Sequence, residues 1–276
     1  MEGETTTLLL TLVPLLLLAG ALAGLLAGLL GVGGGIVVVP ALYYLFGFLG
    51  IDDAVRMHLA VGTSLATIIP TSIRSVKAHQ ARGSFDVDIF RSWAPGIVAG
   101  VIAGTWLATL ADFGTLTSVF AIVALLVATY MALGNPNLQL AEQLPSTLLC
   151  QPIAAVIGMI SAMMGIGGGT MSVPVLNLFG LPIHRAVGTS AGFGLIIAIP
   201  GTLGFAIGGW GNALLPQFSL GYVNWLGLLL IVPMTVLTVP YGAKLAHSMG
   251  TVGLRRAFAL FLGLTSLRMF ADILGS

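Results

Sequence analysis

The sequence predicts an all-α polytopic membrane protein built from two inverted repeats, each of five apolar segments and each with a glycine-rich broken-helix hairpin. Of its 276 residues, 57% are hydrophobic and only 7% are charged, whereas about a quarter of the residues of a soluble domain are charged. Apolar runs such as 8–30 and 116–133 are long enough to span a bilayer. One glycine-rich stretch occurs twice, which indicates internal duplication.

The repeated stretch is the strongest signal in the chain. Residues 31–40 read Gly-Val-Gly-Gly-Gly-Ile-Val-Val-Val-Pro, and residues 165–174 read Gly-Ile-Gly-Gly-Gly-Thr-Met-Ser-Val-Pro. Adjacent glycines form a poor helix because glycine loses the most backbone entropy when it is fixed. The proline that follows has no N–H and disfavours helix at the residue before it. We therefore expect two broken membrane helices, which is typical of a transporter binding site.

The two halves also agree outside the glycines. Ala-Val-Gly-Thr-Ser occurs at 60–64 and at 186–190, and 104–131 matches 242–269 at one constant offset. We divide the chain into a first membrane repeat (1–134), a linker (135–145) and a second membrane repeat (146–276). The expected segments are 7–30, 36–48, 57–80, 93–110 and 116–133 in the first repeat, and 146–164, 171–179, 186–208, 225–247 and 254–273 in the second.

Segment 36–48 would form only about 20 Å of helix, too short for a hydrocarbon core of about 30 Å. We expect it to return from 7–30 as a hairpin with a glycine-rich tip inside the protein. If this hairpin opens outward and the second repeat is inverted, both termini lie outside. Only Arg56 and Arg268 are then external, and the positive-inside rule is satisfied by Arg74, Lys77, Arg82, Arg91, Arg185, Lys244, Arg255 and Arg256.

Free backbone N–H groups at the start of a helix attract anions. The candidate backbone donors are Gly33, Gly34 and Gly35 in the first repeat and Gly167, Gly168 and Gly169 in the second; the alternative is close helix packing, which explains Gly96, Gly100 and Gly104 well. Candidate hydroxyl donors are Thr63, Ser64, Thr189 and Ser190, unless they bond to carbonyls of their own helix. Arg74 and Lys77 would attract anions to the inner mouth, or extend to the interface.

Several classes of function are disfavoured. No carboxylate is placed in the middle of a segment, so the site suits an anion better than a cation. The histidines show no metal-ligand spacing and we expect no metal or cofactor. No basic tract indicates nucleic acid as a partner. The expected partners are a small anionic substrate and the lipid bilayer.

With both glycine stretches, both Gly-Thr-Ser triplets and Arg-Gly-Ser-Phe-Asp at 82–86, the chain resembles the TauE/SafE sulfite exporter family, also called the toluene-sulfonate uptake permeases. The resemblance implies transport of sulfite or a small organosulfur anion across the bacterial inner membrane. Together with the two inverted repeats, it leads us to expect a secondary transporter, not an enzyme, that moves sulfite or a small organosulfonate by alternating access. One alternative is a passive anion channel. A weaker one is an intramembrane serine hydrolase using Ser190, because 188–192 matches the pattern G-x-S-x-G.

Overall fold

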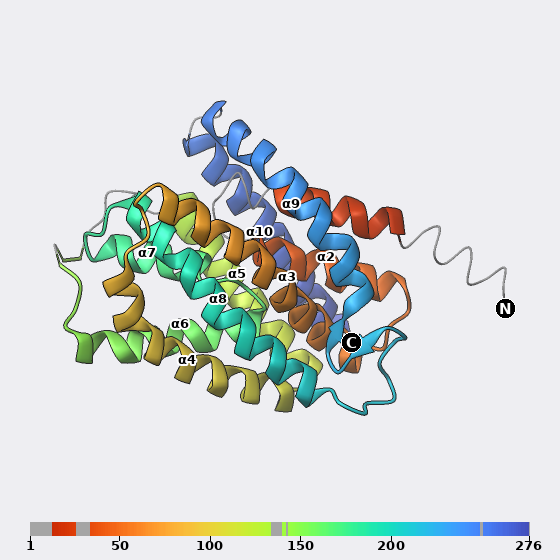
Figure 1. The fold of residues 1–276 in the computed structure, drawn as a ribbon. Coiled ribbons are helices and arrows are strands. Elements are labelled where there is room, and N and C mark those ends of the chain that lie inside the picture. Colours follow the sequence, from red (N-terminus) through yellow and green to blue (C-terminus); the bar gives the residue numbers. More distant parts are fainter. Residues whose placement is uncertain (1–12, 26–33, 134–139, 142, 249–250, 276) are drawn as a thin grey trace.

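The computed structural model describes residues 13–25, 34–133, 140–141, 143–248 and 251–275. Its described part is helical apart from one short β-hairpin. The first helix is Val13–Leu25, and Figure 1 labels the helices after it but not the two strands. The elements that follow the first helix are α2 (Gly35–Phe48), α3 (Asp53–Ala81), α4 (Val87–Leu110), α5 (Phe113–Leu133), α6 (Thr147–Met164), α7 (Gly169–Leu178), α8 (Ile183–Gly208), β1 (Ser219–Leu220), β2 (Val223–Asn224), α9 (Trp225–Ser248) and α10 (Thr251–Gly275).

The predicted all-helical membrane architecture is confirmed. Six described helices are long and apolar enough to cross a membrane, namely α3, α4, α5, α6, α8 and the 258–275 part of α10. Helices α2 and α7 are shorter, as the sequence predicted for the segments that follow the glycines. Of the predicted segment 7–30, residues 7–12 and 26–30 lie outside the described part of the chain.

Helices α3 and α4 begin earlier than their apolar segments because polar residues cap them. The Asp52 carboxylate accepts the Ala54 N–H (2.9 Å) at the start of α3. The Asp86 carboxylate accepts the N–H groups of Asp88 (3.1 Å) and Ile89 (3.0 Å) at the start of α4. Side-chain oxygens at this position satisfy donors that the helix itself leaves free. Hydropathy alone does not detect these polar first turns.

Glycine allows two pairs of helices to pack closely. Ideal Cβ atoms at Gly96 and Gly100 would run into α6, at the carbonyl oxygens of Gln151 and Ala155. Gly24, in the first helix, lies against the Thr235 backbone of α9 in the same way. The packing role predicted for Gly96 and Gly100 is therefore confirmed, and Gly24 has the same role.

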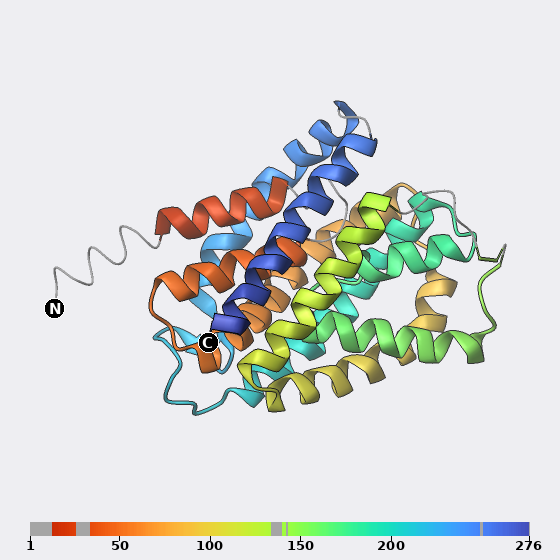
Figure 2. The same ribbon diagram turned by 180° about the vertical axis from the view of Figure 1, so that it is seen from behind.

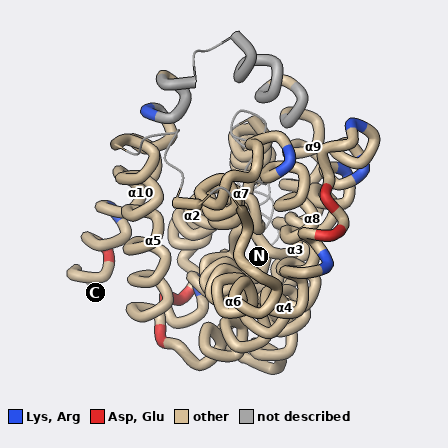
Figure 3. The backbone as a smooth tube through the Cα atoms, turned by 90° about the vertical axis from the view of Figure 1, so that its left-hand side faces the viewer, with Lys and Arg blue, Asp and Glu red and all other residues tan. Residues whose placement is uncertain are grey.

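The helix ends gather in two groups. In Figure 1 the α3–α4 connection and the starts of α6 and α8 lie at the left, while the α4–α5 connection, the β-hairpin and the end of α10 lie at the right; Figure 2 shows the same arrangement from behind. Seen nearly end-on in Figure 3, the charged residues of the described part lie around the periphery and the interior is uncharged. The described glycines at the two breaks, Gly34, Gly35, Gly165, Gly167 and Gly168, are buried in this interior.

Candidate functional site

The second glycine stretch is a break between two helices. Helix α6 ends at Met164, and Gly165 follows in the left-handed conformation (φ 66°, ψ 28°), which glycine adopts most readily. Helix α7 begins at Gly169, and its first bond within the helix joins the Ser172 N–H to the Gly168 carbonyl (2.8 Å). The N–H groups before Ser172 in α7 therefore have no acceptor along the helix. This outcome confirms the predicted break.

The first stretch begins a helix in a similar way. Gly34 precedes α2 in the left-handed conformation (φ 75°, ψ −22°), and its carbonyl accepts the Val38 N–H (3.0 Å). The predicted site residue Gly33 lies outside the described residues. Pro40 and Pro174 lie inside α2 and α7 and not at their ends. The glycines, and not these prolines, therefore mark the breaks.

The two glycine stretches contact each other, and the Ser64 side chain lies beside this contact. An ideal Cβ on Gly35 would lie 2.7 Å from the Gly165 carbonyl oxygen and 3.0 Å from the Ile166 Cα. Ser64, fully buried in α3, donates its hydroxyl to the Gly165 carbonyl (2.7 Å) and lies 3.5 Å from the Gly35 carbonyl. One hydroxyl thus joins the starts of both predicted tips, 101 residues apart in the chain.

The two threonines of the Gly-Thr-Ser triplets hold helix starts in the opposite half of the chain. Thr63 accepts the Asn224 N–H (2.9 Å) just before α9, and Thr189 accepts the Asp86 N–H (3.1 Å) just before α4. Asn224 caps α9 by accepting the Gly227 N–H (2.8 Å), as Asp86 caps α4. Both threonine hydroxyls therefore have partners outside their own helix.

The fourth hydroxyl differs from the other three. Ser190 is 1% exposed, and its Oγ has no hydrogen-bond partner among the described residues. Thr170, in the first turn of α7, is 5% exposed and its Oγ1 is likewise without a partner there. A buried hydroxyl without a partner is unfavourable by about 1–3 kcal/mol. Each such group needs an explanation, and the described structure holds others, among them Ser161 and Ser172 near the same break.

Gly168 brings α7 against α8. An ideal Cβ there would lie 2.7 Å from the Phe193 Cβ and 3.0 Å from the Gly194 backbone nitrogen. Ser190 precedes these two residues by three and four positions, so it lies on the same face of α8. Gly167 has more room, since its ideal Cβ would meet only Ile68, at 3.6 Å. The start of α7 and the unpartnered Ser190 thus share one interface.

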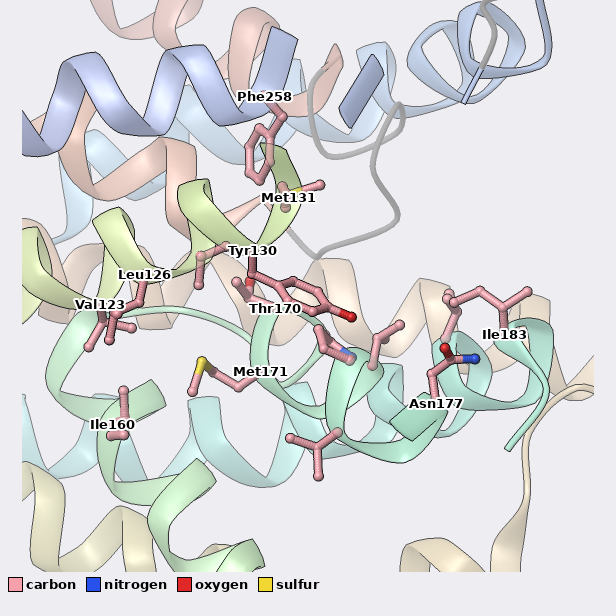
Figure 4. A pocket seen from close by; sticks show the side chains of 16 residues that line it. Val123, Leu126, Tyr130, Met131, Ile160, Thr170, Met171, Asn177, Ile183 and Phe258 are labelled. Atoms are coloured by element: carbon pink, nitrogen blue, oxygen red, sulfur yellow. The ribbon is translucent and has the colours of Figure 1, made fainter. Parts of the chain in front are cut away.

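A pocket of about 480 Å³ opens beside the start of α7. Figure 4 shows Thr170 and Met171 of α7 facing Tyr130 and Leu126 of α5, with Phe258 of α10 above them. None of the described residues that line the pocket is charged, and apolar side chains make up most of its wall. The pocket therefore offers an apolar space that reaches the glycine break through Gly169 and Thr170.

Arg74 and Lys77 are exposed near the end of α3, beyond the buried Ser72. Neither residue lines the pocket, so the structure does not bring them into the glycine site. Their predicted role at a distance stays a prediction. The Arg185 side chain, which we had not selected, pairs with Asp86. Burial raises the pKa of Asp86, but the Ile89 N–H and Arg185 outweigh it, so the pKa is lowered overall.

A second polar site lies at the other end of the molecule, in a cavity of about 470 Å³. Arg56 donates to the Tyr43 hydroxyl (2.8 Å) and pairs with Asp53 (2.9 Å), and its guanidinium lies 4.4 Å from the centre of the Tyr43 ring. Tyr43 donates in turn to Asp272 (3.4 Å), which pairs with Arg268 (3.4 Å). We call these five residues the polar cluster. It ties α2 to α3 and α10.

Sequence reasoning missed the polar cluster and Thr170. The signal for the cluster was that Arg56 and Arg268 were the two basic residues predicted outside. The signal for Thr170 was its position inside the glycine stretch, next to Gly169.

These features define a class. Membrane-spanning helices, interior helix breaks at glycine and buried donors beside an uncharged pocket are typical of membrane transporters. The family model "Sulfite exporter TauE/SafE" matches residues 16–269, and the chain belongs to this family.

The relatives agree with this class. The chain is 37% identical to a probable membrane transporter protein of Haemophilus influenzae, over 94% of this chain and 98% of that protein. It is 28% identical to a probable membrane transporter protein of Methanocaldococcus jannaschii, over 94% and 96%. It is also 28% identical to the probable membrane transporter protein YunE of Bacillus subtilis, over 86% and 89%. No solved structure gives a significant match.

Proposed function

We propose that the protein is a secondary transporter that moves a small sulfur-containing anion across the bacterial inner membrane by alternating access. The observation that carries this proposal is the start of α7. Its first N–H groups have no acceptor along the helix, the Thr170 hydroxyl in its first turn has no partner, and the unpartnered Ser190 lies one turn from the part of α8 that Gly168 meets. A bound anion would accept hydrogen bonds from all of these donors.

The roles of the predicted site residues follow from their partners. Ser190 is the free hydroxyl donor. Gly167 and Gly169 let the anion approach the backbone closely, whereas Gly168 packs α7 against α8. Ser64 fixes the position of Gly165 through its hydrogen bond. Thr63 and Thr189 hold the starts of α9 and α4 around the site. Gly34 and Gly35 of the first stretch would serve the anion in the opposite state of the transport cycle.

Reciprocal contacts support a division into two inverted repeats. Thr63 of the first half contacts the residue before α9, and Thr189 of the second half contacts the residue before α4. Gly62 and Gly188 lie at the carbonyls of Tyr222 and Ser84, each two residues before the capping residue. Repeats that exchange equivalent contacts in this way are expected to be related by an approximate twofold axis. An axis in the membrane plane would invert one repeat.

The two cavities support alternating access because they occupy equivalent positions. The offset between the glycine stretches relates Tyr43 to Asn177, and the constant offset between the last segments relates Arg268 to Tyr130. Tyr43 and Arg268 line the cavity of the polar cluster, whereas Asn177 and Tyr130 line the apolar pocket. The polar cluster links α2, α3 and α10 at one position, and apolar side chains make up most of the wall at the other.

A flux assay in proteoliposomes tests this function. Sulfite, sulfate, alkyl sulfonates and carboxylates would be compared at a fixed membrane potential. We expect saturable flux of sulfite or a sulfonate that is accelerated by the same anion on the opposite side. Flux that rises linearly with concentration and shows no such acceleration would refute the transporter hypothesis and indicate a passive channel. Equal flux of all four classes of anion would refute the sulfur specificity.

A further inference from the structure

The polar cluster joins helices whose backbones have few contacts with each other. Among the described residues, α10 packs chiefly against α5 and only sparsely against α2 and α3. The cavity of about 470 Å³ is lined by residues of α2, α3 and α10. It lies at the end of the molecule that holds the end of α10 (Figure 1). The side chains of the polar cluster therefore make the connection across this cavity.

The two parts of the cluster differ in strength. Arg56 holds Tyr43 by a 2.8 Å hydrogen bond and places its guanidinium 4.4 Å from the centre of the ring. Asp272 contacts the Tyr43 hydroxyl and the 72% exposed Arg268 side chain, each at 3.4 Å, and long contacts and exposed ion pairs contribute little. The Tyr43 ring also stacks on Phe113 of α5, 6.2 Å away. Tyr43 therefore ties α2 firmly to α3 and weakly to α10.

Helix α2 connects this cluster to the glycine site. It begins at Gly35, which lies against the Gly165 carbonyl, and reaches Tyr43 eight residues later, about 12 Å along the helix. Val39 lies midway on the same face. It is fully buried, and its Cγ2 would lie 2.9 Å from a Cβ on Gly165. A displacement of α2 at the glycine site would therefore move Tyr43 relative to α10.

The cluster occurs in only one half of the chain. The repeat offsets place Asn177 at the position of Tyr43 and Pro182 at that of Arg56. Neither residue is charged, so the equivalent ion pair and cation–π contact cannot form there. The halves exchange equivalent threonine contacts without this network. The fold of a repeat therefore does not require the cluster, which points to a role in function.

We propose that the polar cluster is a gate of the transport path: the contact between Tyr43 and Asp272 is made in this state and breaks when the glycine site opens toward this end of the molecule. Helices α2 and α3 then stay joined through Arg56, and the cavity widens between them and α10. This inference rests on the proposed function and assigns the residues that control access to its site. A cluster that only stabilises the fold is the competing explanation.

The experiment measures how fast a reporter cysteine between the cluster and the glycine site reacts with a small charged methanethiosulfonate. The protein is purified in nanodiscs, with Cys150→Ser as the background and Val39→Cys as the reporter. Met171→Cys, at a position that lines the apolar pocket beside α7, is a second reporter and detects general loosening. No substrate is present, so the result does not depend on transport.

Tyr43→Phe keeps the ring and removes the hydroxyl that donates to Asp272. One net hydrogen bond changes an equilibrium constant by roughly two- to tenfold, so Val39→Cys should react faster by about that factor. Met171→Cys should keep its rate within about 1.5-fold. Tyr44→Phe is the matched control, because Tyr44 lines the same cavity and its hydroxyl has no partner in the described structure. It should change neither rate.

Asp272→Ala tests the same contact from α10 and leaves the hydrogen bond between Arg56 and Tyr43 in place. It should accelerate Val39→Cys as Tyr43→Phe does. The double variant should react no faster than the faster single variant, because both changes remove one shared contact.

The outcomes separate the gate from a structural role. No acceleration in Tyr43→Phe, or equal effects of the two phenylalanine variants, would overturn the gate. Equal acceleration of both reporter cysteines would assign the cluster to general stability and overturn it as well. The proposed function is tested by flux alone, so selective labelling together with flux that does not saturate would refute the transporter and retain a gated path.

Discussion

Ser64 and Ser190 occupy equivalent positions in the two halves of the chain, but the structure gives them different surroundings. Ser64 donates a 2.7 Å hydrogen bond to the Gly165 carbonyl. Ser190 is equally buried, and its hydroxyl has no partner among the described residues. Replacing each serine by alanine removes one oxygen from a buried site. The pair therefore separates a structural hydroxyl from one that we propose binds the ligand.

We expect Ser64→Ala to lower the stability of the protein and Ser190→Ala to lower its affinity for the anion. Ser64→Ala leaves the buried Gly165 carbonyl without its donor, which costs about 1–3 kcal/mol. For a protein of this size each kcal/mol lowers the melting temperature by roughly 2–4 °C. Ser190→Ala removes a hydroxyl that gains nothing in the unliganded protein, so its melting temperature should be unchanged or slightly higher. Its loss should weaken anion binding, because a hydrogen bond to a charged ligand is worth about 1.5–3 kcal/mol, or roughly ten- to a hundredfold in affinity.

Thermal unfolding of the purified variants, with and without sulfite or methanesulfonate, measures both quantities. The melting temperature without ligand reports stability, and its rise with ligand reports affinity, since a ligand that binds the folded state stabilises it. Ser64→Ala should melt earlier and keep most of its ligand-induced rise. Ser190→Ala should melt normally and lose that rise. If both variants melt early and bind normally, the unpartnered Ser190 is a structural residue and the proposed site is wrong.

Three further predictions follow from the structure. Gly168→Ala should destabilise the protein, because its Cβ would lie 2.7 Å from that of Phe193, whereas Gly167→Ala should melt within about 1 °C of the wild type; equal losses in thermal unfolding would contradict this packing. The Asp86 carboxyl has a lowered pKa in the folded protein, so its stabilisation should be present above pH 4 and be lost as the pH falls through that lowered value; Asp86→Asn should reduce the loss of unfolding free energy at acidic pH, and an unchanged loss would contradict a stabilising role of the Asp86 carboxylate. Single cysteines at Gly3 and Gly275, in a cysteine-free background, should both react with an impermeant thiol reagent added outside; labelling of only one would eliminate the inverted topology.

The sequence was sufficient for the elements that local physics decides. Apolar runs predicted the spans, and adjacent glycines predicted the break at Gly165–Gly168, because both effects act within a few residues. The repeat also singled out the Gly-Thr-Ser triplets, and the structure places Thr63, Ser64 and Thr189 at contacts between the halves. The segments predicted for α3 and α4 began too late, at 57 and 93, because hydropathy does not detect the polar first turns that begin at Asp53 and Val87. The short β-hairpin gave no apolar signal of its own.

The partners of these residues could not be read from the sequence. The Ser64–Gly165 bond spans 101 residues, and Thr63 and Asn224 are 161 residues apart. Such contacts depend on how helices pack, and no local pattern specifies that packing. Arg56 and Asp272 looked like ordinary interfacial charges at the ends of segments. Only the fold showed that both contact Tyr43.

The reciprocal threonine contacts have a consequence for biosynthesis. The backbone N–H of Asp86, at the start of α4, donates to Thr189, which is synthesised about a hundred residues later. Thr63 accepts the N–H of Asn224, which is synthesised later still. The first five segments therefore enter the bilayer before their final neighbours exist, and their packing stays incomplete until α8 and the β-hairpin are inserted. If the protein is expressed as two fragments divided within the 135–145 linker, a folded protein should form only when both fragments are expressed in the same cell. Either fragment alone should be a substrate for membrane proteases.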